Sequence, residues 1–224
     1  MARMPSAERR RQLTEAAIRA MTRDGVPRTT TRSIAAEAGV SLSVFHYCFD
    51  SKQALLEAVI EAITEHSVAR VREAIRPGAR VQGPAGSAAT SHTGPGGTLR
   101  DTVRAGFQAY WDHVAASPGE HMLTYELTQY ALRQPGFEHL ARRQYELYCA
   151  TYGELLEQLC AATGSELIVP VAVLARYLAA LTGGLTLNHL VLGDPAGAAE
   201  ILDMVADHVA GLIRAPAAQP PSDT

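Results

Sequence analysis

The stretch TTTRSIAAEAGVSLSVFHYCFDSKQALL, residues 29–56, contains two short helical patterns on either side of a glycine. We expect helices over Thr31–Ala38, with Thr30 as N-cap, and over Leu42–Phe49. Gly39 between them permits the positive φ that a tight turn requires. Two short helices joined in this way form a helix-turn-helix.

The apolar residues of this stretch fall where two crossed helices would pack together: Ile34, Ala35, Ala38, Val40, Phe45 and Phe49. Once that face is buried, Leu42, Ser43, His46 and Tyr47 point outward. A short outward-facing helix has the size to enter the major groove of DNA. A helical hairpin in some other fold is the alternative.

The rest of the chain repeats apolar residues every three or four positions, which indicates an all-α fold. Further helices are expected over Ala7–Asp24, from Asp50 or Ser51 to Ile75, and over Thr98–Ser117, Gly119–Gln134, Phe137–Thr163, Val169–Leu192 and Pro195–Arg214. Ser41 is a candidate N-cap, and Gln53 is a candidate capping-box partner of Asp50.

Charge is unevenly distributed along the 224 residues, whose formal net charge is −3. Residues 1–52 hold nine cations and five anions, a net of +4, so the remainder holds −7. A basic N-terminal segment suggests a polyanionic partner. The run Arg9–Arg11 is either an arm that contacts phosphates or a solvated surface.

The pattern divides the chain into a helix-turn-helix domain at 1–52 and a larger helical domain at 53–214. Residues 76–97 are rich in Pro, Gly, Ser and Ala without periodicity, so we expect a flexible loop. The Pro- and Ala-rich residues 215–224 are expected to form a disordered tail.

Cys48, Cys149 and Cys160 show neither C-x-x-C spacing nor even pairing, which favours a reduced, cytoplasmic protein. The N-terminus has no apolar run typical of a signal peptide. The apolar segment 167–192 is interrupted by Arg176, Asn188 and His189, so we interpret it as a core or interface helix rather than a membrane span.

Several spaced elements together resemble the tetracycline-repressor (TetR) family of bacterial regulators. They are Thr29-Thr30, Ile34-Ala35, Ala38-Gly39-Val40-Ser41, Phe49, and Ser51-Lys52 followed by Ala54-Leu55-Leu56. The resemblance is specific over about residues 9–61. It implies about nine helices, a homodimer through the last two long helices, a small-molecule pocket in the larger domain, and release of an operator when ligand binds.

The same resemblance implies roles for individual residues. Thr30, Ser41 and Tyr47 would contact phosphate or groove, Lys52 would contact phosphate, and Arg32 would reach a base or phosphate. Leu42, Ser43 and His46 would face the bases. Val44, His46 and Cys48 depart from the residues usual in the family, so the half-site sequence is not predicted.

The effector candidates are polar and aromatic residues at helical spacing in the larger domain: Trp111, His121, Tyr125, Gln129, Tyr145, Cys149, Tyr152 and Asn188. Such groups around an apolar cavity suit a small amphipathic or aromatic ligand. The alternative is that the tyrosines only pack the core. Asn188 and His189 need polar partners if they are buried.

A dimer surface is predicted on the last two helices from two apolar stripes with small residues beside them: Leu178, Leu181, Leu185 and Leu192, with Ala179, Gly183 and Gly184, and then Ile201, Val205, Val209 and Leu212. A purely intrachain core would use the same residues.

No catalytic or metal-binding motif is present in the sequence, so neither an enzyme nor a cofactor is expected. The sequence predicts a DNA-binding transcriptional regulator, most simply a ligand-responsive repressor of a pseudo-palindromic operator. A helical small-molecule-binding or scaffold protein without DNA binding is the competing hypothesis.

Overall fold

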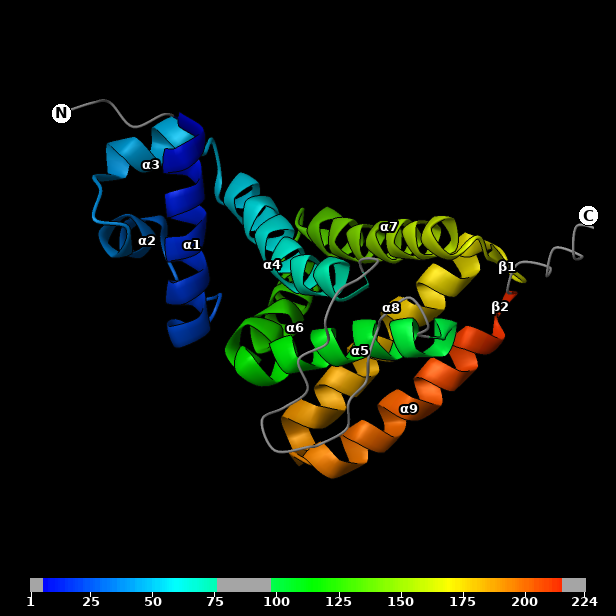
Figure 1. The fold of residues 1–224 in the computed structure, drawn as a ribbon. Helices are drawn as coiled ribbons and strands as arrows, with labels where there is room; N and C mark the ends of the chain where they lie inside the picture. Colours follow the sequence, from blue (N-terminus) through cyan, green and yellow to red (C-terminus); the bar gives the residue numbers. More distant parts are fainter. Residues whose placement is uncertain (1–5, 76–97, 215–224) are drawn as a thin grey trace, which may run out of the picture. The chain divides into compact units, whose positions relative to one another are not determined.

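The computed structural model describes residues 6–75 and 98–214, and this part of the chain is predominantly helical. Nine helices are present in it: α1 Ser6–Asp24, α2 Thr31–Glu37, α3 Leu42–Cys48, α4 Lys52–Ile75, α5 Leu99–Ala116, α6 Pro118–Arg133, α7 Glu138–Thr163, α8 Val171–Leu192 and α9 Pro195–Gly211 (Figure 1). The expected all-α fold is therefore confirmed. The expectations for the loop 76–97 and the tail 215–224 lie outside the described residues.

One feature contradicts the helix boundaries expected from sequence. The last helix ends at Gly211, not Arg214, because Ile213–Arg214 forms a short strand, β2, that pairs antiparallel with β1, Glu166–Leu167. A strand of two residues is too short for any alternation to be recognised in the sequence. The pair ties the end of α9 to the connection between α7 and α8.

The chain divides into two compact units, at 1–66 with 114–147 and at 67–113 with 148–224. In the described residues the first unit holds α1–α3, the start of α4, α6 and the start of α7. The second holds the ends of α4 and α7, most of α5, and α8 and α9. This division differs from the domains expected at 1–52 and 53–214, because α6 and the first part of α7 pack into the same core as the helix-turn-helix.

The core of the first unit is built from the apolar faces that the sequence indicated. Its fully buried large side chains come from α1, α2, α3, α4, α6 and α7 and the residue after α3: Leu13, Met21, Ile34, Phe45, Phe49, Leu55, Leu56, Leu123 and Leu140. Gly39 has the expected positive φ of 66°, and Gly25, which follows α1, has a φ of 84°. Both turns would be strained by any residue with a Cβ.

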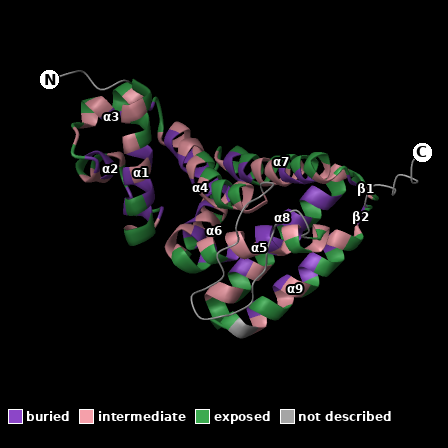
Figure 2. Cartoon of the chain, viewed as in Figure 1, coloured by how far each residue is buried: buried purple, intermediate pink, exposed green. Residues whose placement is uncertain are grey.

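The second unit has its own core from α5, α7, α8 and α9, and burial alternates along each of these helices (Figure 2). Leu178, Val205 and Val209, which were placed on the dimer surface from sequence, lie inside this core. For these three residues the intrachain alternative is correct. A dimer surface and an intrachain core predict the same spacing of apolar residues along α8 and α9. The packing of α5 and α7 against these residues distinguishes the two interpretations.

α8 is long and apolar enough, by length and composition alone, to cross a membrane. Leu174, Leu178 and Thr182 nevertheless face the core of the second unit, and Thr182 hydrogen-bonds within it. This is the pattern of a core helix with one face left exposed.

Candidate DNA-binding surface and effector cavity

The first helix of the helix-turn-helix begins with a complete capping box. The Thr30 hydroxyl accepts a hydrogen bond from the Ser33 N–H at 3.1 Å, and the Ser33 hydroxyl accepts one from the Thr30 N–H at 2.9 Å. The capping box thereby satisfies two of the N–H groups at the helix start. Thr30 and Arg32 are exposed beside this cap.

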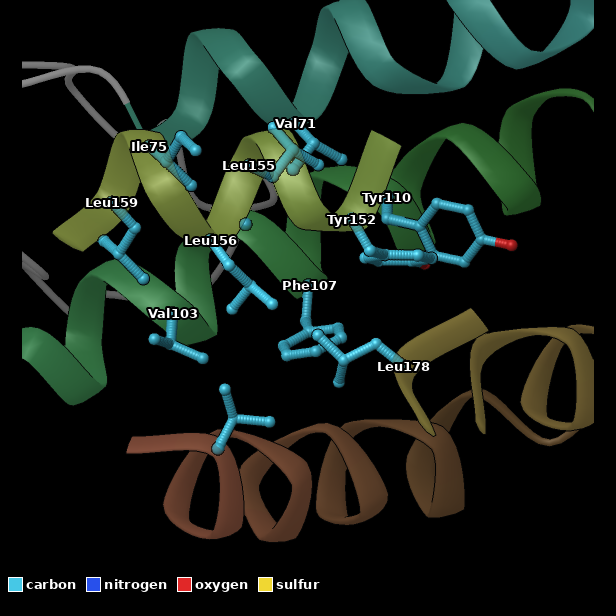
Figure 3. A pocket seen from close by; sticks show the side chains of 12 residues that line it. Val71, Ile75, Val103, Phe107, Tyr110, Tyr152, Leu155, Leu156, Leu159 and Leu178 are labelled. Carbon is cyan, nitrogen blue, oxygen red and sulfur yellow. The ribbon is translucent and has the colours of Figure 1, made fainter. Parts of the chain in front are cut away.

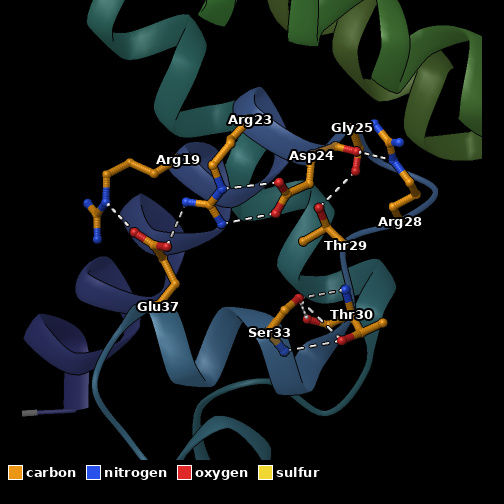
Figure 4. A network of polar contacts seen from close by, with 9 residues as sticks. All are labelled: Arg19, Arg23, Asp24, Gly25, Arg28, Thr29, Thr30, Ser33 and Glu37. Atoms are coloured by element: carbon orange, nitrogen blue, oxygen red, sulfur yellow. Dashed lines mark hydrogen bonds and ion pairs between the residues drawn. The ribbon is translucent and has the colours of Figure 1, made fainter.

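An ionic network fixes α2 against α1 (Figure 4). Arg23 of α1 contacts both Asp24 at 3.0 Å and Glu37, the last residue of α2, at 3.0 Å, while Arg19 reaches Glu37 at 3.2 Å. Hydrogen bonds from Arg23, and then from Arg19, hold the pKa of Glu37 below its usual range. Because these groups are exposed, the network orients α2 more than it stabilises the fold.

α3 presents a polar and aromatic face to solvent. Phe45 is buried, whereas Ser43, His46 and Tyr47 are exposed, with Tyr47 at 67%. Leu42 is half-buried and packs against the core of the first unit. Ser41 occupies the N-cap position, but its hydroxyl lies 2.8 Å from the Ser43 hydroxyl and makes no capping bond, so that part of the expectation is wrong.

The end of α3 is held by an arginine from α1. Arg10 donates a hydrogen bond to the carbonyl oxygen of Cys48 at 2.8 Å, and its guanidinium lies 4.2 Å from the centre of the Phe49 ring. A cation at this position matches the negative end of the helix dipole. Arg9 and Arg11 bond to Gln12 and Glu8, so this run of arginines makes intrachain contacts that neither sequence interpretation included.

The start of α4 differs from expectation. The Ser51 hydroxyl accepts a hydrogen bond from the Ala54 N–H at 3.1 Å, and Gln53 donates to the Gly136 carbonyl instead of forming a capping box with Asp50. The Lys52 ammonium lies 3.4 Å from the Tyr130 hydroxyl and 4.9 Å from the centre of that ring. The Tyr130 ring of α6 therefore helps to fix the position of the Lys52 ammonium group.

A cavity of about 70 Å³ lies within the second unit, between α4, α5, α7, α8 and α9 (Figure 3). Its lining is aliphatic and aromatic: Val71, Ile75, Val103, Gly106, Phe107, Tyr110, Tyr152, Leu155, Leu156, Leu159, Leu178 and Val209. No charged residue is present in this lining. An apolar cavity in a helical unit favours an apolar or aromatic ligand.

Two tyrosine–threonine pairs connect this cavity to α8. The Tyr110 hydroxyl lies 2.8 Å from the Thr186 hydroxyl, and the Tyr152 hydroxyl donates to Thr182 at 2.7 Å. Burial raises the pKa of Tyr110 to about 12 and raises that of Tyr152 further. Both phenols therefore stay neutral and act only as hydrogen-bonding groups.

The structure does not gather the effector candidates into one site. Tyr152 lines the cavity just described, and Cys149 lies half-buried on the same helix. Trp111 and Asn188 line a second cavity in the same unit. His121, Tyr125, Gln129 and Tyr145 belong to the first unit, and Gln129 and Tyr145 are exposed. The sequence analysis did not select Phe107 and Tyr110, because the sequence alone does not show which face of α5 packs toward α8.

These features define a helix-turn-helix DNA-binding protein whose second helical unit contains an apolar cavity. Residues 13–59 match the family of bacterial regulatory proteins called the tetR family, and residues 99–214 match the C-terminal domain of BetI-type transcriptional repressors. The chain belongs to the TetR family of bacterial transcriptional regulators, and its BetI-type C-terminal domain makes it a ligand-responsive DNA-binding repressor.

Relatives match over nearly the whole length. The HTH-type nicotine-responsive transcriptional repressor HdnoR of Paenarthrobacter nicotinovorans is 26% identical, covering 87% of this chain and 89% of its own. The HTH-type transcriptional regulator BetI of Serratia proteamaculans is 28% identical over 92% and 93%. A TetR-family regulator from Rhodococcus sp. superposes with a TM-score of 0.69 at 20% identity, over 91% and 98%, which shows the shared fold.

Proposed function

We propose that the chain binds a pseudo-palindromic operator as a homodimer, with one α3 helix of each copy in the major groove. The observation that carries this is the exposed face of α3, where Ser43, His46 and Tyr47 have no partner helix over them. Lys52, Thr30, Arg32 and Ser41 flank that face and would contact phosphates or groove edges. α3 carries no arginine, so it has no side chain that would form a bidentate pair with guanine. Leu42 and Val44 would instead contact thymine methyl groups.

The exposed face of α8 supports the homodimer. Exposed residues recur on it at spacings of four and three, which is the heptad pattern of a helix–helix seam: Val173, Tyr177, Ala180, Gly184, Leu187 and Val191. Ala180 and Gly184 in the middle permit close approach of a second helix. A Cβ at Gly184 would meet no atom of its own chain within 4 Å, so the small residue is not required by intrachain packing.

The cavity beside Tyr110 and Tyr152 is the proposed effector site. Its lining favours a small, uncharged apolar or aromatic effector whose polar group would replace a tyrosine–threonine bond. A relative that responds to nicotine supports a small-molecule effector. The effector would release the operator only if it binds the DNA-free state more tightly than the DNA-bound state.

A salt titration of operator binding tests the DNA-binding proposal. The logarithm of affinity for the DNA upstream of the chain's own gene should fall with the logarithm of salt concentration, with a slope of roughly −0.9 per phosphate contact. Tyr47→Ala should weaken binding about tenfold, and Lys52→Ala should also make the slope shallower. A flat salt response, or full affinity in both variants, would contradict the proposal and favour a helical scaffold protein.

We infer a cytoplasmic protein that acts without a cofactor and without enzymatic activity. This rests on membership of a family of transcriptional regulators and on the intracellular location of the DNA that it would bind. The three cysteines are free, which fits a reducing compartment.

A further inference from the structure

A second cavity, of about 220 Å³, lies between α5, α8 and α9 in the second unit. It shares no lining residue with the proposed effector cavity. Its walls combine the aliphatic side chains of Leu185, Ile201 and Leu202 with the polar groups of Asn188 and Asp194. This mixture of an apolar wall and a few convergent polar groups is typical of a small-molecule site.

His189 and Trp111 form one wall of this cavity. The His189 ring packs against the Trp111 ring with centroids 4.7 Å apart, and both residues line the cavity. The two rings together form the aromatic part of the cavity wall.

The charged and aromatic groups of the lining favour a cation. Asp194 supplies a carboxylate, and its Oδ1 accepts the Gly197 N–H at 3.1 Å, which fixes the carboxylate at the start of α9. The face of the Trp111 indole attracts cations. Neither lysine nor arginine is among the residues that line the cavity.

We propose that this cavity is a second ligand site, which binds a small protonated amine with an apolar body. The ammonium group faces Asp194 and the Trp111 ring, and the body packs against Leu185 and Ile201. This site differs from the effector cavity, whose lining holds no charged group and selects uncharged compounds.

Trp111 is the only tryptophan in the chain, so its fluorescence reports directly on this cavity. We would titrate the full-length protein with phenethylamine and, in parallel, with phenethyl alcohol, a neutral compound of the same shape. The amine should give a saturable change in fluorescence, with an apparent affinity at least fivefold higher than the alcohol. Equal affinities would overturn the proposal, because they would show that the positive charge is not recognised.

Asp194→Asn removes the charge and keeps a good N-cap oxygen for α9, so the fold should survive. We expect it to weaken amine binding about fivefold, as for a charge-assisted contact at a partly exposed site. The matched control is Glu200→Gln, an exposed carboxylate on the same helix that does not line the cavity. Equal effects of the two variants would contradict a direct role for Asp194.

Two cavity-filling variants locate the ligand. Ile201→Phe should abolish amine binding, and Leu156→Phe, in the effector cavity, should leave it unchanged. Thermal denaturation checks that each variant folds. Amine binding lost only in Leu156→Phe would place the ligand in the effector cavity and overturn the proposal. The proposal would also be overturned if, without amine, the Trp111 fluorescence changed with protein concentration. Such a change would show that a second copy of the chain covers Trp111.

Discussion

The Glu126 carboxylate of α6 accepts a hydrogen bond from the backbone N–H of Val26, 100 residues earlier in the chain, at 3.0 Å. Val26 directly follows Gly25, whose positive φ ends α1. One side chain thus anchors the turn between α1 and α2 to α6, inside the first unit. The orientation of the helix-turn-helix depends on a residue far outside it in sequence.

Glu126→Ala should lower the free energy of unfolding by about 1–2 kcal/mol, because it leaves a partly buried N–H without an acceptor. Urea denaturation measures this effect, and operator affinity should fall with it. Glu126→Gln, which keeps an acceptor oxygen at the same distance, should recover most of the loss. Equal losses in both variants would show that the charge, not the hydrogen bond, matters.

Arg10→Ala should weaken operator binding about three- to tenfold, although Arg10 itself would not contact DNA. The reason is that α3 loses the cation at its C-terminal end and the guanidinium that stacks on Phe49. Arg11→Ala is the matched control, since Arg11 pairs with Glu8 at the surface and such pairs contribute little to stability. Fluorescence anisotropy with labelled operator DNA compares the two variants. If both weaken binding equally, the arginine run acts through its charge alone.

Stability should fall at alkaline pH because of Tyr110. Its pKa is raised to about 12 in the folded chain from an ordinary value of 10. The unfolded state therefore loses its proton first, so the stabilisation is complete below pH 10 and is lost as pH rises through 12. Two pKa units correspond to about 3 kcal/mol. Urea denaturation between pH 8 and 11.5 measures the slope, which Tyr110→Phe should reduce.

Gly184→Glu should convert the proposed homodimer into monomers, because it places a charged side chain in the middle of the exposed seam of α8. No intrachain clash is expected, since a Cβ there meets nothing within 4 Å. Ala150→Glu, at an exposed position of α7, is the matched control. Sedimentation velocity reports the oligomeric state. A Gly184→Glu protein that remains dimeric would place the interface elsewhere.

Much of the fold could be predicted from local signals. Thr30 and Gly39 delimit α2, and the spacing of Ile34, Phe45 and Phe49 orients it against α3, because caps, turns and periodicity act over a few residues. The pairing of Leu167 with Ile213 could not be predicted, because it depends on where two distant helices end.

The candidate site residues also fall into those that local sequence signals predict and those that depend on contacts between distant helices. The outward positions of Ser43, His46 and Tyr47 follow from the burial of Phe45, and the structure places them outside as expected. The effector candidates were chosen by spacing along single helices, which does not say which face meets a neighbour. Tyr152 alone among them lines the apolar cavity, and Tyr145 is half exposed on the same helix.

α9 is tied to its neighbours at its end and along its side. β2 pairs with β1 at its end, and Arg100 of α5 pairs with Asp203 and Asp207 along it. These ties oppose sliding of α9 along its own axis. A movement that reaches α9 would therefore be passed on mainly as a tilt of the helix.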